Sequence, residues 1–479
     1  MFQSGRTPGA MSPASPVTIE RADWQAAVNN PARRLGFSFG LAYVFLRFSM
    51  AHETLTMLTH FNNYLALLTG LPAVVLSVAG GGVGRTWRSA AGKFWIAFVA
   101  FLLCSIPFSN WRGESFTVAS GYLRADFPLL FILGGMTLTW KECRKVLVAL
   151  AISAISALAM EKVFSGMDDG RLSLSGGTIA NSNDYAAHVL LLLPFLLWVV
   201  LVPASRIYKI IALPVLVGGL FIDLKAGSRG ALIGIGVGFL IIVLKGPGKL
   251  RWILGFCAPV IVIAMFSFLP ASVLLRFTTI LGDENTQAVT AADRDKTASA
   301  EESSSARKYL LITSLKYTLE HPFFGVGAGN FSSFEGGSSL AEGKHGQWQE
   351  THNSYTQISS ETGLPAVFCY IGAIACALFS LNRTMLRARR DKVPIILASA
   401  FCTMLSMAMI GTCMAFLSLG YRFYLPALTG LAIALERVAA MDPPSGVSVA
   451  PAPIGGVVRA PVPLPGTPQA RFARQNFRR

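Results

Sequence analysis

Charged residues are scarce in this chain. Only 14% of its 479 residues are Asp, Glu, Lys or Arg, and 53% are hydrophobic, whereas a soluble protein carries roughly 25% charged residues. This shortage and the repeated apolar runs of near-spanning length predict a polytopic helical membrane protein. The net charge of +16 does not indicate a nucleic-acid partner, because Lys and Arg lie mainly in short connections and in the tails.

Cysteine patterns that build disulfides or metal clusters are also missing. Six of the seven cysteines fall inside apolar runs, Cys143 lies in a short basic loop, and no two form a C-x-x-C pair. We therefore expect no disulfide framework, no metal and no cofactor. The first 35 residues are polar and contain Pro, Ser and Ala, so they predict no cleavable signal peptide.

Twelve apolar runs predict an all-α fold, a transmembrane helical bundle with about twelve spans. The spans are expected at residues 36–55, 61–80, 94–109, 123–139, 146–163, 185–202, 208–223, 230–244, 252–270, 365–381, 394–415 and 419–436. The domains that follow are a disordered lead (1–35), nine spans (36–270), one large loop with amphipathic helices (271–364), three spans (365–440) and a disordered basic, Pro-rich tail (441–479).

Two sets of connections alternate along the chain. One set is short and basic, and by the positive-inside rule it is cytoplasmic together with both termini. The other set, at 110–122, 164–184, 224–229 and 271–364, then lies outside and holds nearly all the unusual polar residues, Arg112 among them. No ATP is available on that side, so an enzyme working there needs a substrate that arrives activated.

Two arginines in this outer set occupy constrained positions. Gly227-Ser228-Arg229-Gly230 joins two spans with almost no loop, which holds Arg229 at the bilayer edge, where it either binds an anion or snorkels. A helix is predicted over 305–320, capped by Ser303 to Ser305 and ended before Pro322. On it Arg307 shares a face with a leucine row, Leu311, Leu315 and Leu319, which is expected to lie on the bundle. The alternative is a surface arginine on an interfacial helix.

Two short motifs follow in the large loop. The glycine turn Gly325-Val326-Gly327-Ala328-Gly329-Asn330 follows a helix rather than a strand, so we expect a tight turn that brings backbone close to a ligand or another segment, not a nucleotide site. His352-Asn353-Ser354-Tyr355 then precedes Glu361-Thr362-Gly363-Leu364-Pro365. An imidazole at the membrane surface suits general-base work, and a solvated loop histidine is the alternative.

Polar residues also stand at the outer ends of two spans. Asn181-Ser182-Asn183-Asp184 opens the span at 185, where it caps a helix or binds sugar, and capping is the favoured interpretation. Arg47, His52 and Glu53, at the outer end of the first span, either pair with one another or line a cavity.

Together these motifs resemble the O-antigen ligase and polymerase superfamily. The matching features are Ser228-Arg229-Gly230, the stretch from Arg307 through His321-Pro322 to the glycine turn, His352-Asn353-Ser354-Tyr355, Glu361-Thr362-Gly363-Leu364 and the Asn181-x-Asn183-Asp184 element. The resemblance covers roughly residues 180–380.

The resemblance implies a metal-independent glycosyltransferase of the GT-C type in the bacterial inner membrane. Its donor would be a glycan linked to undecaprenyl diphosphate, and the reaction would take place on the periplasmic face, among membrane lipids. On that pattern His352 is the catalytic base, Arg229 and Arg307 hold the diphosphate, and Asn181, Asn183, Asn353, Tyr355 and Arg112 support the site.

The acceptor stays open at this stage. A ligase transfers to lipid A-core, a polymerase extends a growing glycan, and a protein O-oligosaccharyltransferase modifies protein hydroxyls; we favour the ligase. A secondary transporter belongs to a different class, and it would carry charges at mid-span, broken helices and paired halves. Here the mid-span regions are nearly free of charge, and no similarity between halves is detected.

Overall fold

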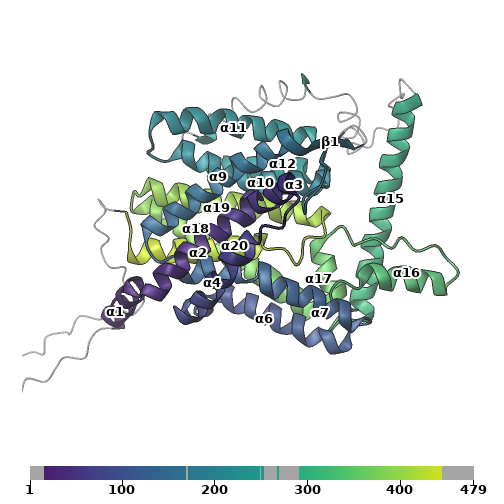
Figure 1. Cartoon of the computed structure of the whole chain (residues 1–479), viewed down its shortest axis with the longest axis horizontal. Coiled ribbons are helices and arrows are strands. Elements are labelled where there is room, and N and C mark those ends of the chain that lie inside the picture. The colour runs from purple at the N-terminus through teal and green to yellow at the C-terminus, as the bar shows by residue number, and fades with distance from the viewer. Residues whose placement is uncertain (1–15, 169–170, 249, 253–266, 269–290, 445–479) are drawn as a thin grey trace, which may run out of the picture. The chain divides into compact units, whose positions relative to one another are not determined.

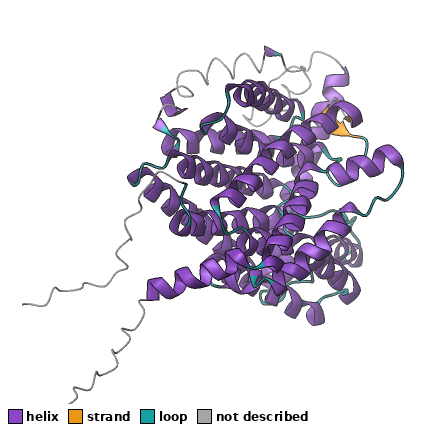
Figure 2. Cartoon of the chain, turned by 60° about the vertical axis from the view of Figure 1, so that its left-hand side comes forward, coloured by secondary structure: helices purple, strands orange, loops and turns teal. Residues whose placement is uncertain are grey.

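The computed structural model describes residues 16–168, 171–248, 250–252, 267–268 and 291–444. Within that part nearly every element is a helix, and one two-stranded hairpin is the only sheet (Figures 1 and 2). The helices are α1 Pro16–Asn29, α2 Pro31–Ser49, α3 Ala51–Thr59, α4 Leu65–Ala79, α5 Gly82–Trp87, α6 Ala90–Ser105, η1 Ile106–Phe108, α7 Arg112–Gly121, η2 Tyr122–Asp126, α8 Pro128–Phe131, η3 Ile132–Met136, α9 Trp140–Phe164, α10 Ser182–Leu201, α11 Arg206–Lys225, α12 Arg229–Lys245, α15 Ala291–Glu320, α16 Phe331–Ala341, α17 Ser354–Thr362, α18 Leu364–Arg390, α19 Pro394–Cys413, η4 Met414–Phe416 and α20 Tyr424–Met441; the strands are β1 Ser165–Asp168 and β2 Arg171–Leu174.

The helical membrane bundle predicted from the apolar runs is confirmed. Eight helical segments in the described residues are long and apolar enough to cross a membrane: Ala90–Phe108, Arg112–Met136, Trp140–Phe164, Ser182–Leu201, Arg206–Lys225, Leu364–Arg390, Pro394–Phe416 and Tyr424–Met441. Two further predicted spans coincide with apolar helices that are shorter, α4 with 15 residues and α12 with 17. The span predicted at 252–270 lies almost wholly outside the described residues.

The first predicted span, 36–55, is not one continuous helix. Met50 takes the left-handed conformation (φ 53°) and separates α2 from α3. The carbonyls freed near this break find side-chain partners: Phe48 O lies 2.9 Å from His188 Nε2, and Ser49 O accepts from Ser156 Oγ at 3.1 Å. Side chains that insert into the helical hydrogen-bond ladder are a known cause of such kinks.

Several predicted boundaries are wrong because helices continue through charged connections. α9 begins at Trp140, since Thr139 and Glu142 form a capping box, so the basic residues 141–145 are helical rather than in a loop. α18 likewise runs through its basic residues to Arg390. The expected outer loops 110–122 and 164–184 contain α7 and the β-hairpin, and the last span starts at Tyr424 rather than at 419.

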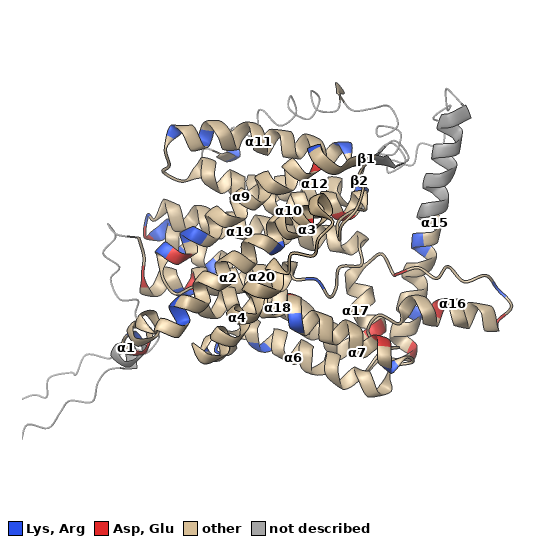
Figure 3. Ribbon diagram, in the orientation of Figure 1, with Lys and Arg blue, Asp and Glu red and all other residues tan. Residues whose placement is uncertain are grey.

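Contacts between distant segments define the two ends of the bundle. At one end, which we name the basic end, Arg33 pairs with Glu142, Arg437 donates to Gly134 O at 2.7 Å, and Lys245 Nζ donates to Asn382 Oδ1 at 2.8 Å. Figure 3 shows many of the blue ribbon segments, which mark Lys and Arg, gathered toward that end. The opposite end, which we name the loop end, carries α7, the hairpin, α15, α16 and α17 (Figure 1). The described residues of the two alternating sets of connections therefore lie at opposite ends of the bundle.

Candidate functional site

The connection between α19 and α20, residues 414–423, ties together segments that are far apart in sequence. The backbone N–H of His352 donates to Ser418 Oγ at 2.9 Å. Ser354 Oγ donates to Leu417 O at 2.6 Å and accepts from Leu419 N–H at 2.8 Å. The turn that carries His352 is therefore fixed to this connection by both backbone and side-chain hydrogen bonds.

His352 is held in an unusual conformation by its neighbours. Its φ of 51° lies in the left-handed region, which costs a residue with a side chain roughly 1–2 kcal/mol. The next residue, Asn353, caps α17 by accepting from the N–H groups of Tyr355 and Thr356. Burial lowers the pKa of His352, and the positive charge of Arg307 lowers it further. The imidazole is consequently neutral near pH 7 and able to accept a proton.

Arg307 reaches the site from α15, although the face of that helix differs from the prediction. The buried side is Leu310, Ser314, Tyr317 and Thr318, which stand three, seven, ten and eleven residues after Arg307 and so share its face. Thr318 Oγ1 lies 2.8 Å from Ser359 Oγ on α17, a hydrogen bond that anchors this side.

The leucine row expected to lie on the bundle instead faces outward, so that prediction is wrong. Leu311, Leu315 and Leu319 are 37%, 48% and 76% exposed. The serines and threonines of the other face bond to polar groups of α17 and to their own helix, which leaves the leucines on the outer side. The predicted cap at Ser303 to Ser305 is also wrong, because α15 already begins at Ala291, whereas its end before Pro322 is confirmed.

Arg229 opens α12 directly beside the same connection. Ser228 caps the helix by accepting from Ala231 N–H, and only three residues separate α11 from α12, as the Gly227-Ser228-Arg229-Gly230 turn predicted. Gly230 packs on Phe416, where an added Cβ would lie 3.0 Å from the phenylalanine Cβ. Gly230, the neighbour of Arg229, and His352 thus both contact residues 416–418, and the charge of Arg307 acts on the pKa of His352.

The glycine turn, residues 325–330, joins the chain after α15 to α17 by hydrogen bonds, as the predicted close approach to another segment indicated. We call this turn the clip. Val326 N–H donates to Ser360 O at 2.8 Å, Gly327 N–H donates to Glu361 O at 2.9 Å, and Gly329 N–H donates to the Glu361 carboxylate at 2.9 Å. A Cβ added at Gly325 (φ 65°) would lie 2.2 Å from the carbonyl carbon of Glu361, so only glycine fits there. Burial raises the pKa of the Glu361 carboxyl to about 8, against the smaller lowering effect of the Gly329 N–H.

The residues named as possible support play mostly structural parts. Asn181 caps α10, which confirms the capping interpretation, and Asn183 lies in the first turn of that helix. Tyr355 donates its hydroxyl to Gly411 O at 2.7 Å, and burial raises its pKa to about 12. Arg112 is exposed at the start of α7, and no hydrogen bond or ion pair joins it to His352 in the part of the chain that the structure describes.

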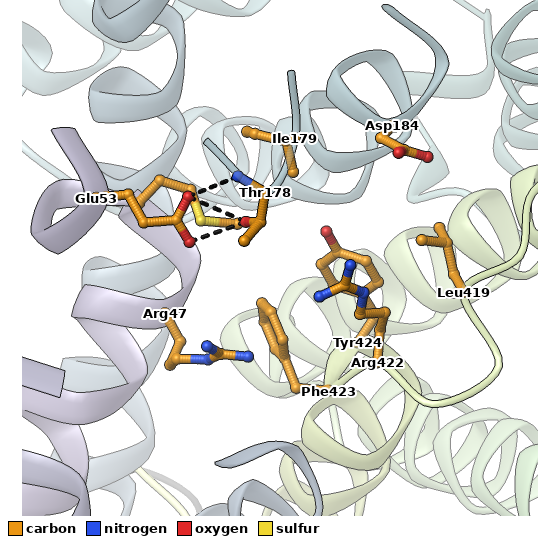
Figure 4. Close-up of a pocket in the computed structure, with 10 residues that line it drawn as sticks. Arg47, Glu53, Thr178, Ile179, Asp184, Leu419, Arg422, Phe423 and Tyr424 are labelled. Carbon is orange, nitrogen blue, oxygen red and sulfur yellow. Dashed lines mark hydrogen bonds between the residues drawn. The ribbon is translucent and has the colours of Figure 1, made fainter. Parts of the chain in front are cut away.

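A small cavity of about 20 Å³ is lined in part by the α19–α20 connection (Figure 4). It is lined by Arg47, Glu53, Asp184 and Arg422 among others, so two of the three residues named at the end of the first predicted span line a cavity and His52 is not among them. Glu53 accepts hydrogen bonds from Thr178, at 2.9 Å from its N–H and 2.8 Å from its hydroxyl. His52 also approaches Glu53, with 3.8 Å between Nε2 and Oε1.

Arg422 was not predicted as a residue of the site, because the predicted span 419–436 includes it. The segment Tyr421-Arg422-Phe423-Tyr424 puts an arginine among aromatic residues just before α20. A charge inside a predicted span signals either a functional residue or a misplaced boundary, and here the boundary was misplaced.

Residues 224–371 match the family model described as O-antigen ligase. The matched stretch is thus similar to the O-antigen ligase and polymerase superfamily that the motifs resemble. It contains Arg229, Arg307, His352 and the glycine turn, whereas Arg47, Asp184 and Arg422 lie outside it. No curated protein matches the chain. The family implies a glycosyltransferase-like enzyme with a lipid-linked glycan as substrate, and the eight apolar helices suggest a multi-pass membrane protein.

Proposed function

We propose that this protein transfers a glycan from undecaprenyl diphosphate to an acceptor hydroxyl on the periplasmic side of the inner membrane, as an O-antigen ligase whose acceptor is lipid A-core. The observation that carries the proposal is the half-buried imidazole of His352, which is held by the connection that Gly230, next to Arg229, also contacts, and whose pKa the charge of Arg307 lowers. All three residues lie in the segment that matches the O-antigen ligase family model.

In the proposed reaction the acceptor oxygen attacks the anomeric carbon of the donor sugar. The bond from that carbon to the diphosphate oxygen breaks, and its electron pair leaves with the diphosphate. His352 takes the hydroxyl proton, which makes the acceptor a competent nucleophile; a positioned base of this kind contributes typically 10²–10⁴-fold. The products are the glycosylated acceptor, undecaprenyl diphosphate and a protonated imidazole that later returns its proton to water.

Arg229 and Arg307 stabilise the leaving group. A guanidinium binds phosphate oxygens in a bidentate manner, and charge develops on the bridging oxygen as the bond breaks. Stabilisation of this type is worth a few kcal/mol per donor. No metal is required by this scheme, so transfer should persist in the presence of a chelator.

Arg307 then has a second effect. Its charge lowers the pKa of His352 in the free protein. A bound diphosphate neutralises part of that charge, so the imidazole becomes more basic when the donor is in place. Proton abstraction is favoured at the moment when the glycan can be transferred.

The test is a transfer assay with purified protein, a lipid-diphosphate-linked glycan and lipid A-core. His352→Ala should abolish transfer while donor binding persists, and Arg229→Lys should chiefly weaken donor engagement. His345→Ala, a change at an exposed histidine of the same loop, is the matched control and should transfer normally. Full activity of His352→Ala at normal protein level would eliminate the base assignment.

The acceptor is identified by the lipopolysaccharide profile of a deletion strain. Loss of long chains from the core supports the ligase. A single repeat left on the core identifies a polymerase instead. Solute transport by the purified protein with no transfer product would identify a transporter and eliminate the enzyme hypothesis.

A further inference from the structure

A groove of about 650 Å³ lies between α2 and α9, away from the candidate site. Its walls are mostly apolar: Leu41 and Phe45 come from α2, and Val148 and Ile152 come from α9. Val148 and Ile152 are 38% and 49% exposed, and Leu41 and Phe45 are half-buried, so the groove opens on the outer surface of the bundle.

One end of this groove carries a cluster of three cations. Lys141, Arg144 and Lys145 line it from the first turns of α9, at the basic end. They share a helix face with Val148 and Ile152, because the spacings from Lys141 are 3, 4, 7 and 11 residues. All three are exposed, and none makes a hydrogen bond or ion pair within the described residues.

The nearest acid in sequence does not neutralise this cluster. Glu142 directs one carboxylate oxygen to Arg33 and the other to the N–H of Leu138 at 2.9 Å. The residues that line the groove include no Asp or Glu. The groove therefore combines an apolar wall with an uncompensated positive end.

We propose that this groove binds one anionic phospholipid, with the phosphate on Lys141, Arg144 and Lys145 and an acyl chain along the apolar wall. From Lys141 to Ile152 the helical rise spans about 16 Å, close to the depth of one leaflet in a hydrocarbon core of about 30 Å. Basic pockets between membrane helices bind anionic headgroups in this way. A topology signal alone needs the charges but not the groove beside them.

Native mass spectrometry of the full chain in detergent, with phosphatidylglycerol or phosphatidylcholine added, tests the proposal. The variant Lys141→Gln/Arg144→Gln/Lys145→Gln should bind phosphatidylglycerol at least about tenfold more weakly than the unchanged chain, because each basic residue contributes to headgroup attraction. The matched control is Arg206→Gln/Lys209→Gln, which removes charge from the first turn of α11 and should bind like the unchanged chain.

A second variant separates the groove from simple charge attraction. Ala42 lines the groove from α2 and is half-buried, so Ala42→Trp should block the acyl chain while all three cations remain. Phosphatidylglycerol binding should fall severalfold in this variant too. The proposal is overturned by undiminished binding in either the triple variant or Ala42→Trp, or by equal binding of phosphatidylcholine. Should the triple variant fail to fold, Ala42→Trp alone decides the matter.

Discussion

Ser418 Oγ accepts a hydrogen bond of 2.9 Å from the backbone N–H of His352. The two residues are 66 positions apart, and the bond joins the large loop to the connection between the last two helices. Because His352 adopts a left-handed backbone conformation, this bond helps to hold in place the turn that carries the imidazole, our proposed base.

Ser418→Ala should therefore lower the transfer rate without preventing donor binding. Removal of one positioning hydrogen bond is expected to reduce the rate about tenfold, equivalent to roughly 1.4 kcal/mol in the barrier. Steady-state kinetics should show the loss in kcat rather than in KM for the donor. Ser120→Ala is the control, since that hydroxyl donates only to its own helix, at Thr117 O. An unchanged kcat in Ser418→Ala would contradict the positioning role.

Arg307→Gln should shift the pH dependence of the residual activity. Burial and the Arg307 charge both lower the pKa of His352. Removing the charge raises that pKa, so His352 stays protonated up to a higher pH, and the acidic limb of the rate profile moves toward higher pH. Lys308→Gln, which changes the exposed neighbour, should leave the limb in place. An acidic limb that does not move would show that the charge of Arg307 does not influence the pKa of His352.

Glu361→Gln should make stability less sensitive to pH. The folded carboxyl keeps its proton up to about pH 8, against 4.5 for the ordinary group. Between these values the unfolded chain ionises and the folded chain does not, so stability falls as pH rises, by at most about 1.4 kcal/mol per pH unit. Thermal unfolding in detergent from pH 5 to pH 8 should show a steep fall in apparent Tm for the unchanged chain and a flatter profile for Glu361→Gln. Parallel profiles would refute a buried, protonated Glu361.

Gly325→Ala should destabilise the protein, and Gly337→Ala should not. The first change places a Cβ 2.2 Å from the backbone of Glu361 in a left-handed turn, whereas the second meets open space on α16. Strain and overlap are expected to cost more than about 2 kcal/mol at Gly325, while alanine favours the helix by up to about 1 kcal/mol at Gly337. Apparent Tm values of the two variants measure the difference. Equal Tm values would show that the clip is not essential to stability.

The sequence predicted the local chemistry of turns and caps better than it predicted which face of a helix turns inward. The glycine at 325 and the asparagine at 181 are residue types that favour a particular local backbone structure. The tight glycine turn and the helix cap of α10 could therefore be predicted directly from them. The face of α15 could not, because periodicity shows only which residues share a side. Which side turns inward depends on contacts such as the hydrogen bond between Thr318 and Ser359 of α17, two residues that are 41 positions apart.

Arg422 and Met50 were missed for related reasons. Arg422 lies beside three aromatic residues, whose hydrophobicity extended the predicted span over a connection. At the break near Met50, the carbonyl oxygens of Phe48 and Ser49 are hydrogen-bonded by the side chains of His188 and Ser156, and these two residues are distant in sequence. Both features follow from tertiary contacts that no local pattern contains.

The outward leucines give α15 an apolar outer side. The inner side of α15, which carries Arg307, is tied to α17 by the Thr318–Ser359 hydrogen bond, so the leucines remain on the opposite side, where lipid can reach them. We expect the thickness and composition of the surrounding lipid to change the affinity for the donor in the proposed reaction.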